Sequence, residues 1–388
     1  RTYIGRSNQA MEEILQEFTA ISEDPYKWLS DWKKANNRKL VAVYPLHVPE
    51  EVIHAAGALP FIIQRTNELI TLSQQWLQSY FCDFSRSTLD LILKGKLDFV
   101  DGIVLGDTCF VNRGLPHIFQ KRSPQFYQYN IFLPKPLNKT SAQDMLREQL
   151  KKYRAAMEKF SGAPIGDAGL WKSIEAYNEN RSLIRQIYAL RRSAPGTIKA
   201  REMQAIVRAS MLMPKEEHNA RLKKLLPELK RRKAAGGDGP KLLISGCMCE
   251  DVLVDILDFV EDLGAVVVDD DVYTGHRYVA VDAPHAADPI EALAQKYLAM
   301  IPCPTRYRPD WDWGKYLVDR VKESGARGVV IIAVTHCEPH WYAYPNLRNK
   351  LQAAGIPHFY LESEQESLAL GRVRTRVEAF MEMVKGGA

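Results

Sequence analysis

The chain has 388 residues, of which 46% are hydrophobic and 26% charged, and this composition excludes disordered, collagen-like and coiled-coil proteins. Its length suits two or three domains rather than a single core. No stretch approaches about eighteen consecutive apolar residues, and the first residues contain no apolar segment, so we expect a cytoplasmic protein with neither a membrane span nor a signal peptide. The six cysteines are too few for a disulfide scaffold and are expected to be reduced thiols or metal ligands.

The formal net charge of +5 is unevenly distributed along the chain. Residues 141–240 contain 21 Lys and Arg against 11 Asp and Glu, so the excess of positive charge lies in this segment. These charges fall within helical patterns and no nucleic-acid-binding module accompanies them, which favours a solvated helical surface over a nucleic-acid site. An anionic ligand such as a phosphorylated cofactor, or an acidic partner, is the second interpretation.

Helical periodicity dominates residues 1–38, and from Lys39 short β-branched runs alternate with helical stretches. Such alternation is typical of parallel sheets that helices cover on both faces, so we expect an α/β domain in this part of the chain. The runs predicted as strands are KLVAVYPL (39–46), LPFII (59–63), the run that ends near Gly106, and QFYQYNIFLP (125–134).

Residues 141–238 are predicted to be mostly helical, and the clearest linker of the chain, AAGGDGP, occupies 234–240. Strands are then predicted at KLLISGC (241–247), AVVVDDD (265–271), GVVIIAVTHC (328–337) and PHFYLES (357–363), with helices between them. The predicted fold class is α/β, with two doubly wound parallel-sheet domains joined by a long helical segment. Its predicted divisions are N-terminal helices at 1–38, a first α/β domain at 39–140, a helical connection at 141–238 and a second α/β domain at 239–388.

Three cysteines lie just past the ends of predicted strands. Cys109, Cys247 and Cys337 each follow such a run and have polar or charged neighbours. The carboxyl edge of an open parallel sheet is where the strand order reverses and leaves a crevice that holds ligands. A single buried cysteine is ordinarily an inert packing residue, so it is the shared position that indicates a site.

The cysteine spacings narrow the kind of site. Cys-x-x-Cys is absent from the sequence, which excludes zinc ribbons and bacterial ferredoxin-type clusters. A cysteine nucleophile beside His336 is an alternative, although no oxyanion-hole motif lies near it. Single cysteines that converge in a crevice favour an iron–sulfur cluster, because its irons prefer thiolate ligands.

Several sequence blocks resemble those of the 2-hydroxyacyl-CoA dehydratase and benzoyl-CoA reductase family and follow the same order along nearly the whole chain. That family opens with a Pro-x-Glu run leading to Ala-Ala-Gly-x-x-Pro, which HVPEEVIHAAGALP (47–60) matches. Cys82 in FCDFSRS and Cys109 in LGDTCF follow at the spacings of the family's first two cluster cysteines. The later blocks that match are LLISGC, DLGAVVVDDDVYTGHRY, IPCP and VTHCEP.

The resemblance implies that Cys82, Cys109 and Cys337 ligate one 4Fe–4S cluster. Within the family, the chain is most similar to the smaller iron–sulfur subunit of ATP-dependent benzoyl-CoA reductases. These heteromeric oxidoreductases of anaerobic aromatic degradation reduce benzoyl-CoA to a cyclic dienoyl-CoA. The implied partners are a paralogous iron–sulfur subunit, ATP-hydrolysing electron-activating subunits, ferredoxin as the ultimate donor, and the acyl-CoA substrate. The sequence has neither GxGxxG nor a P-loop, so we expect ATP to bind to a partner.

Four further residues acquire candidate roles from the resemblance. His47 and Glu51 flank the Pro motif at the end of the first strand, which makes each a candidate proton donor near the acyl group. A helix cap or a structural hydrogen bond is the plainer interpretation of both. His276 and Arg277 are candidates for contact with a thioester or a phosphate, and an exposed salt bridge is the simpler account of Arg277.

The chain has three cysteines in addition to the family's usual three, namely Cys247, Cys249 and Cys303. They are candidates for a second cubane, as in double-cubane-cluster reductases, or for packing beside the first cluster. Residues 266–275 lack the extra cysteines that some relatives have there. The alternative functions are a subunit of an (R)-2-hydroxyacyl-CoA dehydratase, which uses the same fold and cluster, and a non-enzymatic subunit that scaffolds its paralogue or relays electrons.

Overall fold

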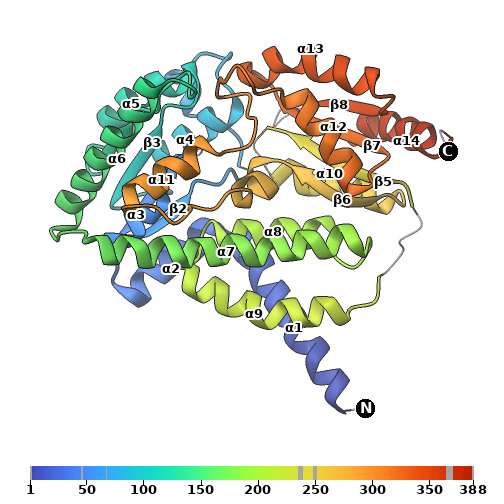
Figure 1. Cartoon of the computed structure of the whole chain (residues 1–388), viewed down its shortest axis with the longest axis horizontal. Helices are drawn as coiled ribbons and strands as arrows, with labels where there is room; N and C mark the ends of the chain where they lie inside the picture. Colours follow the sequence, from blue (N-terminus) through green and yellow to red (C-terminus); the bar gives the residue numbers. More distant parts are fainter. Residues whose placement is uncertain are drawn as a thin grey trace.

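The computed structural model describes residues 2–44, 47–66, 68–234, 239–247, 251–363 and 370–386. In this part of the chain there are two four-stranded sheets, and every strand pair in them is parallel. Figure 1 shows the two sheets side by side, with long helices running beneath them. The predicted fold class, with two parallel-sheet α/β units and a helical segment between them, is confirmed.

The two sheets share one strand order. The strands are β1 (Leu40–Tyr44), β2 (Leu59–Ile62), β3 (Gly102–Gly106), β4 (Tyr127–Ile131), β5 (Lys241–Gly246), β6 (Val266–Asp271), β7 (Gly328–Val334) and β8 (His358–Ser363). The order is β2-β1-β3-β4 in the first sheet and β6-β5-β7-β8 in the second. The direction of winding therefore reverses between β1 and β3 and between β5 and β7. A crevice is expected beyond the carboxyl ends at each reversal.

Helices precede, connect and follow these strands. They are α1 (Thr2–Glu23), α2 (Pro25–Asn36), α3 (Glu50–Ala55), α4 (Asp83–Leu93), α5 (Phe110–Arg122), α6 (Thr140–Ser161), α7 (Asp167–Ser193), α8 (Ala200–Ser210), α9 (Lys215–Arg231), α10 (Asp251–Asp262), α11 (Pro289–Leu298), α12 (Trp313–Ser324), α13 (Glu338–Ala353) and α14 (Leu370–Gly386), with a short 3-10 turn at Ser73–Gln75 and a π turn at Tyr273–Arg277. None of the described helices combines the length and the apolar character that crossing a membrane would require.

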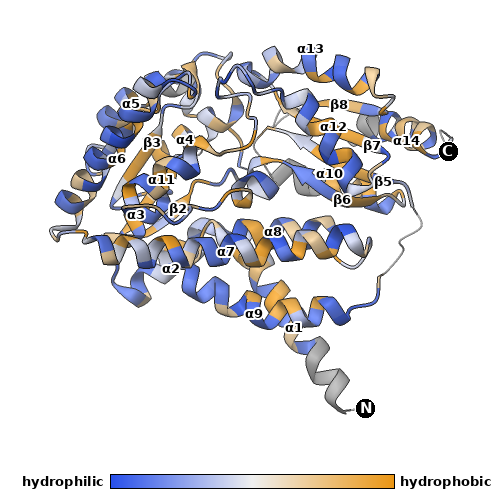
Figure 2. Cartoon of the chain, viewed as in Figure 1, coloured by the Kyte–Doolittle hydropathy of each residue, from blue (hydrophilic) through white to orange (hydrophobic). Residues whose placement is uncertain are grey.

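The second sheet is buried on both faces, as the near-continuous hydrophobic runs of its strands require. Along β5, Leu242 and Ile244 belong to a core formed with α10 and α14, whereas Leu243 belongs to a separate core formed with α12 and α13. Successive side chains of a strand point to opposite faces of the sheet, which explains why Leu243 belongs to a different core from its two neighbours. In Figure 2 the helices carry both hydrophilic and hydrophobic residues, and α5 and α6 at the edge of the molecule are predominantly hydrophilic.

The first sheet lies in a larger core that includes helices from distant parts of the chain. The long helix α7 contacts α3 and α9 and also reaches β6 of the second sheet. Helix α11 comes from the second half of the sequence, yet Ile290 and Leu293 are buried in the first core. An ion pair between Arg147 on α6 and Glu291 joins α11 to the first unit. The domain boundaries expected from the sequence stay a prediction, but the two halves evidently share packing.

Gly246, at the end of β5, is required by its surroundings. Its φ is 141°, and a Cβ atom at this position would lie 1.8 Å from the carbonyl oxygen of Ile332 on β7. We therefore expect Gly246→Ala to destabilise the protein by about 2 kcal/mol or more, since both the backbone conformation and the contact oppose a side chain. Gly169→Ala is the matched control, because Gly169 lies in α7 with open space around it and should gain about 0.5–1 kcal/mol. Urea unfolding would measure both changes, and an unaffected Gly246→Ala protein would contradict this account.

Candidate functional site

Each of the three predicted cluster cysteines precedes a helix. Cys82 is the N-cap residue of α4, Cys109 of α5 and Cys337 of α13. A helix N-terminus exposes unpaired backbone N–H groups and the positive end of the helix dipole, both of which favour a nearby negative charge. Each helix end therefore contributes a partial positive charge beside its cysteine, although burial opposes ionisation of Cys82 and Cys337.

The three cysteines interact electrostatically with one buried side chain, Tyr44, at the carboxyl end of β1. Its hydroxyl lies 2.9 Å from Ser85 Oγ, which in turn lies 3.2 Å from Cys82 Sγ. Burial raises the pKa of the Tyr44 hydroxyl well above its usual value, and electrostatic interactions with Cys82, Cys109 and Cys337 add to the increase. The Tyr44 hydroxyl therefore interacts electrostatically with all three thiols, which precede α4, α5 and α13. Their role as cluster ligands stays a prediction.

Burial also affects the thiols themselves. It raises the pKa of Cys82 to about 11, and the neighbouring Cys337 contributes to this increase. A hydrogen bond with Cys247, followed by burial, raises the pKa of Cys337 well above its usual value. Without a metal both groups are therefore protonated at neutral pH, and metal binding must release their protons.

Cys247 and Cys337 form a compact group with His340. The ligand atoms of these three residues all lie within 4.8 Å of one another, and Cys337 Sγ lies 3.2 Å from His340 Nδ1. Cys247 follows β5, while Cys337 and His340 lie at the start of α13, one helical turn apart. His340 was missed in the sequence, although its spacing from Cys337, Cys-x-x-His, was a readable signal of a possible metal ligand. Cys249 lies outside the described residues.

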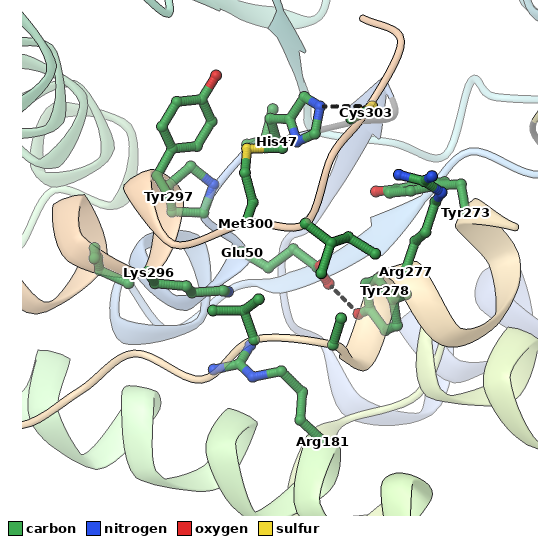
Figure 3. Close-up of a pocket in the computed structure, with 16 residues that line it drawn as sticks. His47, Glu50, Arg181, Tyr273, Arg277, Tyr278, Lys296, Tyr297, Met300 and Cys303 are labelled. Atoms are coloured by element: carbon green, nitrogen blue, oxygen red, sulfur yellow. Dashed lines mark hydrogen bonds between the residues drawn. The ribbon is translucent and has the colours of Figure 1, made fainter. Parts of the chain in front are cut away.

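Cys303 is placed elsewhere, in a pocket shown in Figure 3. Its Sγ lies 3.2 Å from Thr305 Oγ1 and 4.0 Å from His47 Nε2. Among the described residues, the group that contains Cys247 does not include Cys303. A second cubane on Cys247, Cys249 and Cys303 stays a prediction.

The pocket has a volume of about 130 Å³ and lies between the start of α3 and the segments on either side of α11. Tyrosine rings and aliphatic side chains form much of its wall, and His47 lies at one end (Figure 3). Burial lowers the pKa of His47 well below its usual value, and the positive charges of Arg306 and Arg277 lower it further. The imidazole is therefore neutral at pH 7, so it can act as a hydrogen-bonding group but not as a fixed positive charge.

The two adjacent carboxylates of α3 have different surroundings. Glu51 is 1% exposed, and its Oε1 lies 3.0 Å from Arg181 Nη1 and 2.7 Å from Lys296 Nζ. Burial opposes its ionisation, but these two cations outweigh burial and lower its pKa to about 2. Glu50, not Glu51, lines the pocket. The sequence analysis named Glu51 as the candidate. Two consecutive glutamates cannot be distinguished from the sequence, so only the structure shows which of them faces the cavity.

Glu50 belongs to a chain of three hydrogen-bonding groups. Tyr278 Oη donates to Glu50 Oε2 at 3.0 Å, and Lys215 Nζ donates to Tyr278 Oη at 2.9 Å (Figure 3 shows the first of these bonds). Burial raises the pKa of Glu50 and lowers that of Lys215 to about 8. Glu50 is thus the pocket carboxyl whose protonated form is favoured by its surroundings.

Arg277 lines the same pocket, whereas His276 is not among its lining residues. The Arg277 guanidinium is buried in an ion pair, with Nε 2.9 Å from Asp271 Oδ1, so the salt bridge expected from the sequence is present but is not exposed. The backbone N–H of His276 donates to Asp270 Oδ1 at 2.8 Å, and the His276 ring lies edge-on against Tyr188. Contact of either residue with a thioester or a phosphate stays a prediction.

A series of side-chain contacts connects the pocket residue Arg277 with Cys337. Asp271, the partner of Arg277, also accepts a hydrogen bond of 2.9 Å from Trp313 Nε1. The Trp313 ring lies edge-on against His340, which contacts Cys337. Three side chains, Asp271, Trp313 and His340, therefore lie between Arg277 and the Cys337 thiol.

Comparison with protein-family models matches residues 45–384 to the family described as 2-hydroxyglutaryl-CoA dehydratase, D-component. The chain belongs to this family, and the resemblance seen in the sequence is confirmed. Over 96% of its length the chain is 30% identical to the C subunit of benzoyl-CoA reductase from Thauera aromatica and covers 98% of that protein. It is 26% identical to the (R)-phenyllactyl-CoA dehydratase beta subunit of Clostridium sporogenes and 28% identical to the beta subunit of (R)-2-hydroxyglutaryl-CoA dehydratase from Acidaminococcus fermentans, at 98% and 99% coverage of those proteins. These relatives are components of enzymes that catalyse redox or dehydration reactions.

Removing the Glu51 charge should destabilise the protein in a pH-dependent way. The pKa of Glu51 falls from its usual value of 4.5 to about 2 in the folded state, so its ion pairs stabilise the fold fully above pH 4.5 and lose that effect as the pH falls through 2. We expect Glu51→Gln to cost about 3 kcal/mol at pH 7 and about half of that at pH 3. Urea unfolding at the two pH values would measure the difference.

Glu148→Gln is the matched control for this experiment. Glu148 is exposed on α6 and pairs with Lys151, so its neutralisation should change the stability far less than that of Glu51. A cost of Glu51→Gln that does not shrink between pH 7 and pH 3 would contradict the assigned ion pairs.

Proposed function

We propose that the chain is the iron–sulfur subunit of an ATP-dependent benzoyl-CoA reductase complex in the cytoplasm, with Cys82, Cys109 and Cys337 as ligands of a 4Fe–4S cluster. The observation that carries the proposal is that each of these cysteines is the N-cap residue of a helix and that all three interact electrostatically with one side chain, Tyr44. The 30% identity to a benzoyl-CoA reductase component over nearly the full length of both chains supports the choice of enzyme.

The residues around Tyr44 fit such a cluster in their chemistry. Its irons prefer thiolate ligands, and three thiols come together here from α4, α5 and α13. Three cysteines leave one iron without a protein thiolate, and a bound cluster would supply electrons at low potential. The chain contributes positive helix ends toward the thiolates.

The pocket fits the acyl part of the substrate. Its volume of about 130 Å³ is close to that of engineered apolar cavities, roughly 150 Å³, that bind benzene, and tyrosine rings line it. Burial raises the pKa of Glu50, which is the direction of shift that favours a proton donor, and neutral His47 is a second hydrogen-bonding group. Glu51 would act through its neighbours, since it holds Lys296 and Arg181 in place.

Exposed aromatic side chains near the cysteines support a partner subunit at this surface. Tyr80, Phe110 and Tyr342 are 55%, 73% and 83% exposed, and each lies within five residues of a different proposed ligand cysteine. Large exposed aromatic side chains are typical of protein interfaces. A paralogous iron–sulfur subunit and an ATP-hydrolysing, ferredoxin-fed electron donor are the partners that the proposed function requires.

An (R)-2-hydroxyacyl-CoA dehydratase is the second candidate, because two of the relatives named above are beta subunits of such enzymes with comparable coverage. Product analysis separates the two functions. The reconstituted complex would be supplied with benzoyl-CoA or with a 2-hydroxyacyl-CoA, ATP and a low-potential donor. A cyclic dienoyl-CoA from benzoyl-CoA supports the reductase, and a 2-enoyl-CoA from the hydroxy substrate alone supports the dehydratase.

Substitution of the proposed ligands should remove iron. In anaerobically purified protein we expect about four irons per chain, and Cys82→Ser, Cys109→Ser and Cys337→Ser should each lose most of them because serine is a poor ligand for these irons. Iron and sulfide analysis measures the loss, and circular dichroism shows whether each variant is folded. Full iron retention in all three folded variants would overturn the ligand assignment.

The double variant Cys247→Ala, Cys303→Ala is the control that tests the second cubane. We expect an unchanged iron content, because Cys303 lies in the pocket while Cys247 contacts Cys337. A loss of about half the iron from a starting value of about eight would instead support two cubanes.

A further inference from the structure

The group of Cys247, Cys337 and His340 has the dimensions of a site for a single metal ion. In a tetrahedral zinc site the metal–sulfur and metal–nitrogen bonds are about 2.3 and 2.0 Å, so two ligand atoms of one ion lie roughly 3.5–3.8 Å apart. All the ligand atoms of the group lie within 4.8 Å of one another, and the Cys337 Sγ–His340 Nδ1 distance is 3.2 Å. Small side-chain rotations therefore suffice to place one ion between them.

This group differs in kind from the proposed cluster ligands. In a cubane each thiolate binds a different iron, so its cysteines need not lie close enough to share one ion. Among the described residues, the close group contains neither Cys82 nor Cys109. It also contains a histidine, and two thiolates with one imidazole form a donor set that zinc and ferrous iron accept.

The backbone positions this group in advance. The Val334 N–H donates to Cys247 Sγ at 3.4 Å, and the Cys247 N–H donates to the Ile332 carbonyl oxygen at 3.0 Å. His336, just before Cys337, has a φ of 63°, a left-handed conformation that a non-glycine residue adopts only when its surroundings impose it. The Trp313 ring holds His340 from the side.

We propose that Cys247, Cys337 and His340 bind one soft divalent cation, Fe²⁺ or Zn²⁺, in the chain that lacks its cluster. Three protein ligands leave a fourth position open for water or sulfide. Only the relation of this site to the cluster rests on the proposed function: because Cys337 belongs to both sets, ion and cluster compete for its thiolate. The site would thus hold a metal before the cluster is assembled or after it is lost.

The test uses the full chain, freed of iron and kept reduced, and titrates it with Co²⁺ as a spectroscopic probe. We expect one Co²⁺ per chain, with thiolate-to-metal charge-transfer bands and the strong visible bands of tetrahedral cobalt, and displacement by Zn²⁺. Cys247→Ser and His340→Gln should each weaken Co²⁺ binding by about tenfold or more, since each removes a ligand. Both variants should keep the iron content of the unaltered protein when purified with the cluster, and circular dichroism confirms their fold.

Cys82→Ser and Cys109→Ser are the matched controls, which should bind Co²⁺ as the unaltered chain does while losing cluster iron. Unchanged Co²⁺ affinity in folded Cys247→Ser and His340→Gln would overturn the proposal, as would loss of Co²⁺ binding in Cys82→Ser. Loss of cluster iron in both Cys247→Ser and His340→Gln would also overturn it, because the group would then be part of the cluster site. Retention of cluster iron in Cys82→Ser and Cys109→Ser would contradict the proposed function and leave the cation site standing.

Discussion

The parallel pairing of the strands is the constraint on which the rest of the structure depends. When neighbouring strands run in the same direction, all their carboxyl ends meet at one edge, and the helix that follows each strand begins there. Helix α5 follows β3 and α13 follows β7, so Cys109 and Cys337 are placed at helix N-termini by the topology of the sheets. Each of these two cysteines therefore lies beside the positive end of a helix, which favours the thiolate that metal binding requires.

The charged residues around the pocket are arranged so that few of them are free. Among the lining cations, Lys296 and Arg181 neutralise Glu51, and Arg277 neutralises Asp271. Replacing a whole buried ion pair of this kind by apolar residues often changes the stability little, whereas removing one partner is costly because the other charge stays buried, and the pair fixes the side chains that bear it. The pocket therefore offers a space lined by tyrosine rings and aliphatic side chains, with one carboxyl among its lining residues, Glu50, whose pKa is raised by burial.

Much of this arrangement was readable in the sequence, because it follows from local patterns. The alternation of β-branched runs with helical stretches predicted both parallel sheets, and the position of Cys109 and Cys337 after strands predicted which edge carries a site. What could not be read are contacts between distant residues. The packing of Leu293 on the first core, the choice of Glu50 over Glu51 and the central position of Tyr44 depend on how the two units fit together, which no periodicity encodes. The shared strand order of the two sheets is likewise a property of the fold, since no sequence repeat accompanies it.

The most direct test of the central claim is a crystal structure of the anaerobically purified protein with anomalous scattering recorded at the iron absorption edge. The account predicts iron density bounded by the N-termini of α4, α5 and α13, with Cys82, Cys109 and Cys337 in direct contact with it. Iron bound at another place in the chain, without these three thiolates among its ligands, would contradict the account.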